Sequence, residues 1–295
     1  MNNKKRFARL GAMLLAAALI SASVPLNDSL TATLPVYPSA QAVAASARQP
    51  DVSAKSAIVI DADTMSVLYE KNADERRAMA STTKLMTLLL AVEKGNMNEI
   101  ITVPDSASTV PSDSTRVPVY PGENMPFKDL VYALMIKSGN DAANAIGTLV
   151  SGSVAAFVSD MNARAGAMGL SDTNFKNAHG YPADGHYSSA RDLAKLMARV
   201  IDNPTAMKVL TTRSYTMASG KTIANTYAIL NPDSPYYYKY AVGGKTGYCA
   251  SSGQCFCCVA EKDGHTLISV VLHSALTKPE KWIDTKAILE YAFSL

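Results

Sequence analysis

The sequence predicts an α/β protein of the α+β type, in which an antiparallel sheet is closed by the two ends of the chain and an all-helical subdomain is inserted between them. Three observations carry this prediction. Alternating, β-branched-rich segments occur early and late in the chain, helical patterns dominate between about residues 96 and 204, and the last segment is again helical. Strands and helices segregated along a chain in this way are typical of α+β architectures. With 295 residues, 48% of them hydrophobic, the chain can bury a substantial core.

The first predicted elements are a hairpin and a helix. Residues 57–60 and 65–69 are rich in β-branched side chains and flank an Asp/Thr turn, which predicts a β-hairpin. A polar connection then leads to Ser81 and the apolar run 85–92. Because serine is favoured at helix N-termini and Gly95 is a typical helix stop, the run predicts a buried helix with Ser81 at its start.

The middle of the chain has helical periodicity and the rest has strand periodicity. After a loop region with one short strand at 100–103, four segments predict helices: 127–137, 141–150, 154–168 and 190–201. Beyond Asn203-Pro204, five segments predict strands: 214–217, 222–226, 240–247, 255–260 and 267–273. Residues 261–264 predict a hairpin turn, and Pro279 predicts the start of a last helix.

Residues 1–42 are predicted to be a secretory signal peptide. Four basic residues precede the apolar run 10–22, which is too short to span a bilayer comfortably. Small-residue cleavage sites follow at 21–23 and 40–42, and the second is favoured because the segment between them has no periodicity. We therefore expect an exported protein, in the extracytoplasmic envelope or secreted. An uncleaved N-terminal membrane anchor is the alternative.

The rest of the chain is predicted to be a linker at 43–55 and one domain at 56–295. The formal net charge of +3 falls to zero without residues 1–42, which contain four basic residues and one acidic residue. No basic stripe with interleaved aromatic residues remains, so no nucleic-acid partner is expected.

The four cysteines lie close together, at positions 249, 255, 257 and 258. An even number in an exported protein indicates disulfides, and a bridge between Cys249 and Cys255 across a hairpin is one option. Adjacent Cys257 and Cys258 cannot easily pair, and Cys255 and Cys257 share a strand face. The spacing matches no familiar zinc pattern, so small buried thiols are the favoured interpretation and no metal is expected.

Ser81 and Lys84 lie three residues apart at the start of the predicted helix, so their side chains share one face within hydrogen-bond reach. A serine hydroxyl is a weak nucleophile until a base takes its proton, and a desolvated lysine with a lowered pKa can be that base. Free backbone N–H groups at the helix start can stabilise an oxyanion. Taken alone, the pair is better explained by ordinary helix capping and a solvated amine.

Two further motifs change this balance. Ser138-Gly139-Asn140 falls between two predicted helices, and Lys245-Thr246-Gly247 ends a predicted strand. A second hydroxyl and an amide beside a Ser–Lys pair can relay a proton to a leaving group and hold the lysine in place. An edge strand with lysine and threonine can bind a carboxylate-bearing peptide by strand addition. Each motif alone is an ordinary turn or strand end, but their joint occurrence in this order favours a catalytic site.

With these three motifs, the sequence resembles the low-molecular-mass penicillin-binding proteins that are serine-type D-alanyl-D-alanine carboxypeptidases. The match runs from about Ala57 to the C-terminus and includes the stretches 81–87, 138–143, 177–180, 186–194 and 244–248. The resemblance implies a penicillin-binding/β-lactamase-like transpeptidase fold, in which helices flank a five-stranded antiparallel sheet. It also implies peptidoglycan stem pentapeptides as substrates and β-lactam antibiotics as inhibitors, with no cofactor.

The resemblance implies a role for each motif. Ser81 would attack the carbonyl between the two terminal D-alanines, form an acyl-enzyme and release D-alanine, with Lys84 as the proton acceptor. Ser138 would relay a proton, and Asn140 would bind the substrate amide or Lys84.

The remaining implied residues bind the substrate. Lys245 and Thr246 would engage its terminal carboxylate, and Gly247 would let its backbone approach closely. The oxyanion would lie between the backbone N–H groups of Ser81 and Tyr248.

Several residues argue for alternatives or depart from the family pattern. His179 and His186 could form a Ser–His pair, but both lie in a Gly/Pro/Tyr-rich connection and Lys84 already fills the role of the base, so a structural role is favoured. Cys249 stands where many relatives have threonine. Lys281 stands where many have a carboxylate-binding arginine, and lysine lacks the bidentate fork of arginine.

Two rival functions remain. A β-lactamase shares the fold, but it needs a device for rapid deacylation, and neither Ser138-Gly139-Asn140 nor the helical block provides the expected pattern. A non-catalytic penicillin-binding or wall-sensing module is the other rival. Since the chain stops at Leu295, after the last predicted helix, we expect no C-terminal β-rich domain.

Overall fold

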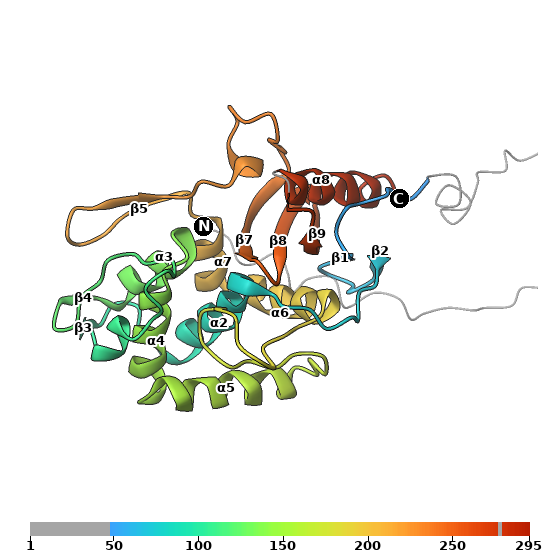
Figure 1. The fold of residues 1–295 in the computed structure, drawn as a ribbon. Helices are drawn as coiled ribbons and strands as arrows, with labels where there is room; N and C mark the ends of the chain where they lie inside the picture. The colour runs from blue at the N-terminus through green and yellow to red at the C-terminus, as the bar shows by residue number, and fades with distance from the viewer. Residues whose placement is uncertain (1–47, 277–278) are drawn as a thin grey trace, which may run out of the picture. The chain divides into compact units, whose positions relative to one another are not determined.

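The computed structural model describes residues 48–276 and 279–295, which belong to one compact unit (Figure 1). The predicted signal peptide lies outside these residues. The strands are β1 (Ser56–Asp61), β2 (Val67–Lys71), β3 (Ile100–Thr102), β4 (Asn124–Pro126), β5 (Ser214–Thr216), β6 (Thr222–Ala224), β7 (Ala241–Cys249), β8 (Gly253–Lys262) and β9 (His265–Ser274). The α-helices are α2 (Lys84–Lys94), α3 (Phe127–Ile136), α4 (Asn140–Ser151), α5 (Val154–Ala167), α6 (Ala190–Asp202), α7 (Pro204–Thr211) and α8 (Glu280–Ala292). Short 3₁₀ turns are η1 (Ala80–Thr83), η2 (Asp105–Ser108) and η3 (Ala228–Leu230).

The central sheet confirms the predicted topology. It has five strands in the order β2-β1-β9-β8-β7, and every neighbouring pair is antiparallel. The first and last strands of the described residues lie side by side within the sheet, where Val59 of β1 pairs with Ser269 of β9. The pairs β3–β4 and β5–β6 form two small separate sheets. This arrangement leaves β7 as an edge strand, with one side available for a neighbour.

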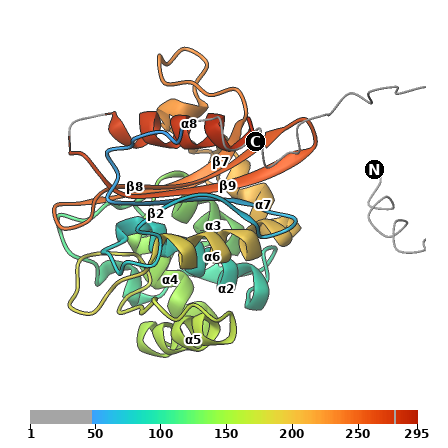
Figure 2. The same cartoon turned by 90° about the vertical axis from the view of Figure 1, so that its right-hand side faces the viewer.

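Helices cover both faces of this sheet (Figure 2). Side chains alternate along β8, so that Phe256 and Cys258 face α8 while Cys257 and Val259 face the larger helical block. Phe256 packs edge-on against Trp282 of α8, with ring centroids 4.8 Å apart. A strand buried on both faces explains why its sequence is almost continuously apolar.

The helices agree with the predicted segments, except for α7. Asn203-Pro204 was expected to end the helical block, but the pair instead starts another helix. The side chain of Asn203 accepts hydrogen bonds from the backbone N–H groups of Thr205 and Ala206, at 3.0 and 3.1 Å. Proline follows at the first helical position, where its missing N–H costs nothing. Asn-Pro is therefore a helix start here, and β4 also lay outside the predicted elements.

In the part of the chain that the structure describes, no single helix has the length and apolar character needed to cross a membrane. Only α4 and α5 together meet those criteria, as a pair bent by 82°.

Candidate active site

Ser81 lies in the 3₁₀ turn η1, directly before helix α2. The prediction that Ser81 starts the α-helix was slightly wrong, because α2 begins at Lys84. Ala80 has a left-handed backbone (φ +46°), which is unfavourable for alanine. The hydroxyls of Thr82 and Thr83 donate to the carbonyls of Met79 and Ala80, both at 2.7 Å, and stabilise the turn. The turn therefore positions Ser81 without using its hydroxyl as a helix cap.

Lys84 is fully buried directly behind Ser81. Its Nζ lies 3.0 Å from Ser81 Oγ, 2.7 Å from Asn140 Oδ1 and 2.6 Å from the His179 carbonyl oxygen. Burial lowers the pKa of Lys84 well below its ordinary value, and the nearby positive charge of Lys245 lowers this pKa further. A lowered pKa favours the neutral amine, the form of lysine that can take the Ser81 proton.

A second lysine–serine pair lies beside the first. Lys245, on β7, is also fully buried, and its Nζ lies 3.0 Å from Ser138 Oγ and 2.9 Å from the Thr246 carbonyl oxygen. Ser138 occupies the short loop between α3 and α4 with a left-handed backbone (φ +60°). Because Asn140 starts α4 two residues later, this loop contributes one side chain to each lysine.

Strand β7 packs directly against the Ser81 turn at Gly247. A Cβ atom at this position would lie 2.7 Å from the Met79 carbonyl oxygen and 3.1 Å from the Ser81 nitrogen, so only glycine permits this approach. The contact brings the backbone of Tyr248 next to Ser81, while the Tyr248 side chain remains 64% exposed. Thr246 lies one residue earlier along the same edge, its nitrogen 3.4 Å from the Tyr227 hydroxyl.

A cavity of about 470 Å³ opens at Ser81, within the ~300–1,000 Å³ usual for ligand sites. Three segments form its walls around Ser81 and Asn140: residues 113–115, residues 180–182 and residues 248–250. The first segment was not predicted to belong to the site. Long-range folding brings it there, because the Asn140 N–H donates to the Thr115 carbonyl at 2.8 Å.

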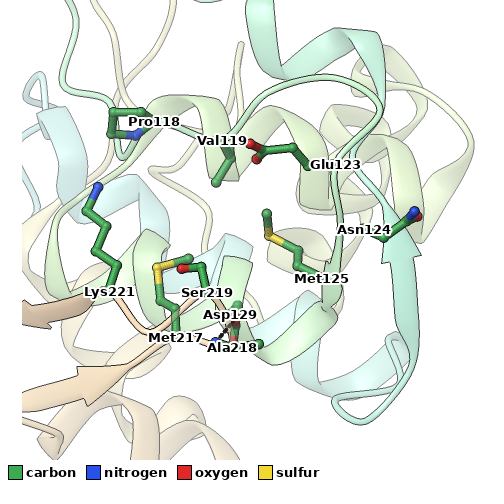
Figure 3. Close-up of a pocket in the computed structure, with 10 residues that line it drawn as sticks. All are labelled: Pro118, Val119, Glu123, Asn124, Met125, Asp129, Met217, Ala218, Ser219 and Lys221. Carbon is green, nitrogen blue, oxygen red and sulfur yellow. Dashed lines mark hydrogen bonds between the residues drawn. The ribbon is translucent and has the colours of Figure 1, made fainter.

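Another cavity, of about 370 Å³, lies between the start of α3 and the β5–β6 hairpin (Figure 3). It contains none of the predicted site residues. Asp129 in its wall accepts hydrogen bonds from the Tyr215 hydroxyl at 2.6 Å and the Ala218 N–H at 2.7 Å. This carboxylate therefore fastens the hairpin to α3.

The two histidines have structural partners. Burial, and to a smaller extent the charge of Lys84, lowers the pKa of His179 to about 3 and that of His186 to about 4, so both are neutral. His186 Nδ1 accepts the Lys176 N–H at 2.9 Å, and His186 Nε2 lies 2.8 Å from Thr83 Oγ1. Since the Thr83 hydroxyl donates to Ala80, His186 Nε2 carries the proton and braces the Ser81 turn.

Several other contacts around the site were not predicted. Lys84 uses the backbone carbonyl of His179, a residue whose Gly-containing stretch had been singled out in the sequence. Tyr227, whose hydroxyl lies 3.5 Å from Lys245 Nζ, carried no local signal. Asp141 is buried beside Asn140, and burial raises its pKa although the N–H groups of Val117 and Ala142 hydrogen-bond to it.

The two departures from the family pattern lie at one end of β7. Cys249 lines the cavity, and its Sγ lies 3.1 Å from the Ser252 hydroxyl. Lys281 donates to Gln254 Oε1 at 2.8 Å, and Gln254 pairs with Tyr248 across the hairpin. All four cysteines are free thiols, and those at 255, 257 and 258 are buried, as the favoured interpretation predicted.

Among residues 48–276 and 279–295, no group of three or more His, Cys, Asp or Glu side chains is arranged to hold a metal ion.

Comparisons with known proteins agree with this geometry. A family model described as D-alanyl-D-alanine carboxypeptidase matches residues 43–275. DacF of Bacillus subtilis is 35% identical over 245 residues, covering 82% of this chain and 62% of DacF. DacA of Escherichia coli strain K12 is 33% identical over 254 residues, covering 83% of this chain and 62% of DacA. The chain thus spans less than two thirds of the length of these relatives.

Solved structures show the same fold. The crystal structure of a Streptomyces DD-transpeptidase matches with a TM-score of 0.77 at 29% identity, covering 84% of this chain and all of that one. A D-alanyl-D-alanine carboxypeptidase from Mycobacterium tuberculosis matches with a TM-score of 0.77 at 26% identity, covering 84% of this chain and 94% of that one. From the family model and these relatives together, we conclude that the chain belongs to the D-alanyl-D-alanine carboxypeptidase family.

Proposed function

We propose that this protein is a serine-type D-alanyl-D-alanine carboxypeptidase that removes the terminal D-alanine from peptidoglycan stem peptides through an acyl-Ser81 intermediate. The observation that carries the proposal is the buried Lys84 amine, 3.0 Å from Ser81 Oγ. Burial costs a charged lysine several kcal/mol, a cost that a neutral amine avoids. The pair therefore combines a hydroxyl with a base at hydrogen-bond distance.

In the first half of the reaction, Lys84 takes the proton of Ser81 as Oγ bonds to the carbonyl carbon of the penultimate D-alanine. The resulting oxyanion lies at the backbone N–H groups of Ser81 and Tyr248. The peptide C–N bond then breaks, and Ser138 relays the proton held by Lys84 to the departing D-alanine amine, which leaves Lys84 neutral again and the Ser138 hydroxyl intact. In the second half, Lys84 takes a proton from water as the water oxygen bonds to the acyl carbon. The ester C–O bond then breaks, Lys84 returns this proton to Ser81 Oγ, and the shortened peptide leaves.

Strand β7 is the proposed binding edge for the substrate. The substrate backbone lies along this strand, and its terminal carboxylate lies at Lys245 and Thr246, with Gly247 facing the reacting carbonyl. β-Lactams acylate Ser81 in the same way, since they present a reactive carbonyl and a carboxylate. Both proposals require an extracytoplasmic location, where the peptidoglycan substrate lies.

Two measurements test the enzyme assignment. Intact mass after incubation with penicillin, followed by peptide mapping, should place one penicilloyl group on Ser81, and Lys84→Ala should abolish it. Release of D-alanine from a synthetic acyl-D-Ala-D-Ala peptide should then distinguish an enzyme from a non-catalytic penicillin-binding module. Labelling of any other residue, or acylation without release of D-alanine, contradicts the proposal.

A β-lactamase is distinguished by the lifetime of the penicilloyl-enzyme. A lifetime of minutes or longer supports the carboxypeptidase, and one of milliseconds supports the lactamase. The proposed export is tested separately by N-terminal sequencing of the mature protein from the producing cell, which should begin near residue 43. Retention of residues 1–42 would indicate a membrane anchor instead.

A further inference from the structure

The cavity at Ser81 is lined by the part of β7 that follows Gly247. Along β7, Lys245 and Thr246 come before Gly247, which faces the Ser81 turn, and Tyr248 to Ala250 come after it. The cavity is lined by residues 248–250 and by Ser81, and not by Lys245, Thr246 or Ser138. If the terminal carboxylate of a bound peptide lies at Lys245 and Thr246, the cavity therefore receives the part of the peptide on the acyl side of the scissile bond.

One carboxylate in the cavity wall is held in a fixed position. The Tyr181 hydroxyl lies 3.1 Å from both carboxylate oxygens of Asp113. The loop that carries Asp113 is fixed from behind, because the Thr115 carbonyl accepts the Asn140 N–H at 2.8 Å and the Val117 N–H donates to Asp141 at 3.0 Å. Asp113 is thus tied to the segment that also carries Asn140.

The negative charge of Asp113 is not neutralised by a neighbour. Across the described residues, 48–276 and 279–295, no lysine, arginine or histidine forms an ion pair with it. The carboxylate is exposed at the cavity mouth, and its bond to a neutral phenol leaves further lone pairs open to a second donor. A carboxylate in this position favours a cationic ligand group.

We propose that Asp113 binds a primary ammonium at the end of the substrate side chain that precedes the acyl D-alanine. This inference rests on the proposed function and adds a specificity-determining residue to it: Asp113 favours peptides whose side chain at that position carries a free terminal amine. Asp113 does not touch the reacting atoms, so it determines specificity and takes no part in the acyl transfer.

The test compares three peptides that differ only in that side chain. They are Nα-acetyl-L-lysyl-D-Ala-D-Ala, its Nε-acetylated form, and the norleucine analogue, which lacks the amine. For the unaltered protein, kcat/KM for D-alanine release should be about two- to fivefold higher with the free amine than with either analogue, as for an exposed ion pair. Asp113→Asn should bring these ratios to about one.

Asp184→Asn is the matched control, because Asp184 is an exposed carboxylate of the neighbouring loop that does not line this cavity. Asp184→Asn should leave the kcat/KM ratios unchanged. If it lowers them as much as Asp113→Asn does, the preference is a general effect of negative charge, and the assignment to Asp113 is overturned. Ratios that persist in Asp113→Asn, or that are near one in the unaltered protein, overturn it as well. Release of D-alanine from the norleucine peptide tests the proposed function separately. If none of the three peptides releases D-alanine, both proposals are wrong.

Discussion

Gly180 packs against the turn that carries Ser81, so replacement of Gly180 by alanine is expected to displace Ser81. A Cβ atom at Gly180 would lie 1.9 Å from the Ala80 carbonyl oxygen and 2.9 Å from the Ser81 nitrogen. To reach ordinary contact distance, the two segments must separate by about 1.5 Å. A misplacement of ~1 Å can cost about a hundredfold in rate, so Gly180→Ala should slow acylation of Ser81 by at least about a hundredfold.

The assay is the second-order rate of labelling by a fluorescent penicillin, with Tm measured in parallel. Gly220→Ala is the matched control, since Gly220 has nearly the same left-handed backbone (φ +84° against +88°) but no atom within 4 Å of its added Cβ. The left-handed strain of ~1–2 kcal/mol is common to both variants and should lower Tm by about 2–8 °C in each. If Gly180→Ala is acylated as fast as Gly220→Ala, the contact between Gly180 and Ala80 does not position Ser81, and the reasoning is refuted.

Four further predictions follow from charge and burial. Lys245→Ala removes a positive charge that lowers the pKa of Lys84, so this pKa should rise. The acidic limb of the pH–acylation profile, below which Lys84 is protonated, should then move to higher pH. An acidic limb that does not move contradicts the coupling between the two lysines. The pKa values of about 3 for His179 and about 4 for His186 lie below the ordinary 6.5, so only the unfolded chain takes up these protons between pH 6.5 and 4, and Tm should fall as pH drops through that range. His186→Ala should lower the free energy of unfolding at pH 7 by ~1–3 kcal/mol, through loss of its buried hydrogen bonds, and should therefore lower Tm. It should also flatten the pH dependence of Tm. Iodoacetamide should add to Cys249 alone in the native protein and to all four cysteines after unfolding, as counted by intact mass, since burial keeps the other three unreactive.

The helices and strands were predictable because the spacing of apolar residues in the local sequence reflects which faces are buried. The unbroken apolar runs of β1 and β8 both follow from burial of these strands on their two faces. The same local rules failed at Asn203-Pro204, because this residue pair is typical both of the start of a helix and of the end of a helical segment. They also placed Ser81 on an α-helix, since a 3₁₀ turn and an α-helical first turn have similar patterns.

The candidate site was predictable only where its residues cluster in the sequence. Ser81 and Lys84 are linked by helical spacing, and Ser138 and Asn140 share one loop, so short motifs reveal them. Asp113 reaches the cavity through hydrogen bonds that its loop makes with α4, and no local pattern encodes contacts of this kind. The same holds for Tyr227 beside Lys245, which depends on the path of the whole segment before β7.

The candidate active site is completed only when late segments of the chain reach early ones. Strand β1 pairs with β9, and Gly247 of β7 packs on the turn that carries Ser81. A ribosome makes Ser81 and Lys84 well before it makes β7, β8 and β9. Until those strands exist, β1 lacks its partner β9, and Ser81 lacks the edge strand that is proposed to bind a peptide or a penicillin. We therefore expect that a nascent chain, or one truncated before β7, carries Ser81 but is not acylated. Because the sheet pairs segments that are far apart in the sequence, we also expect its formation to be slow.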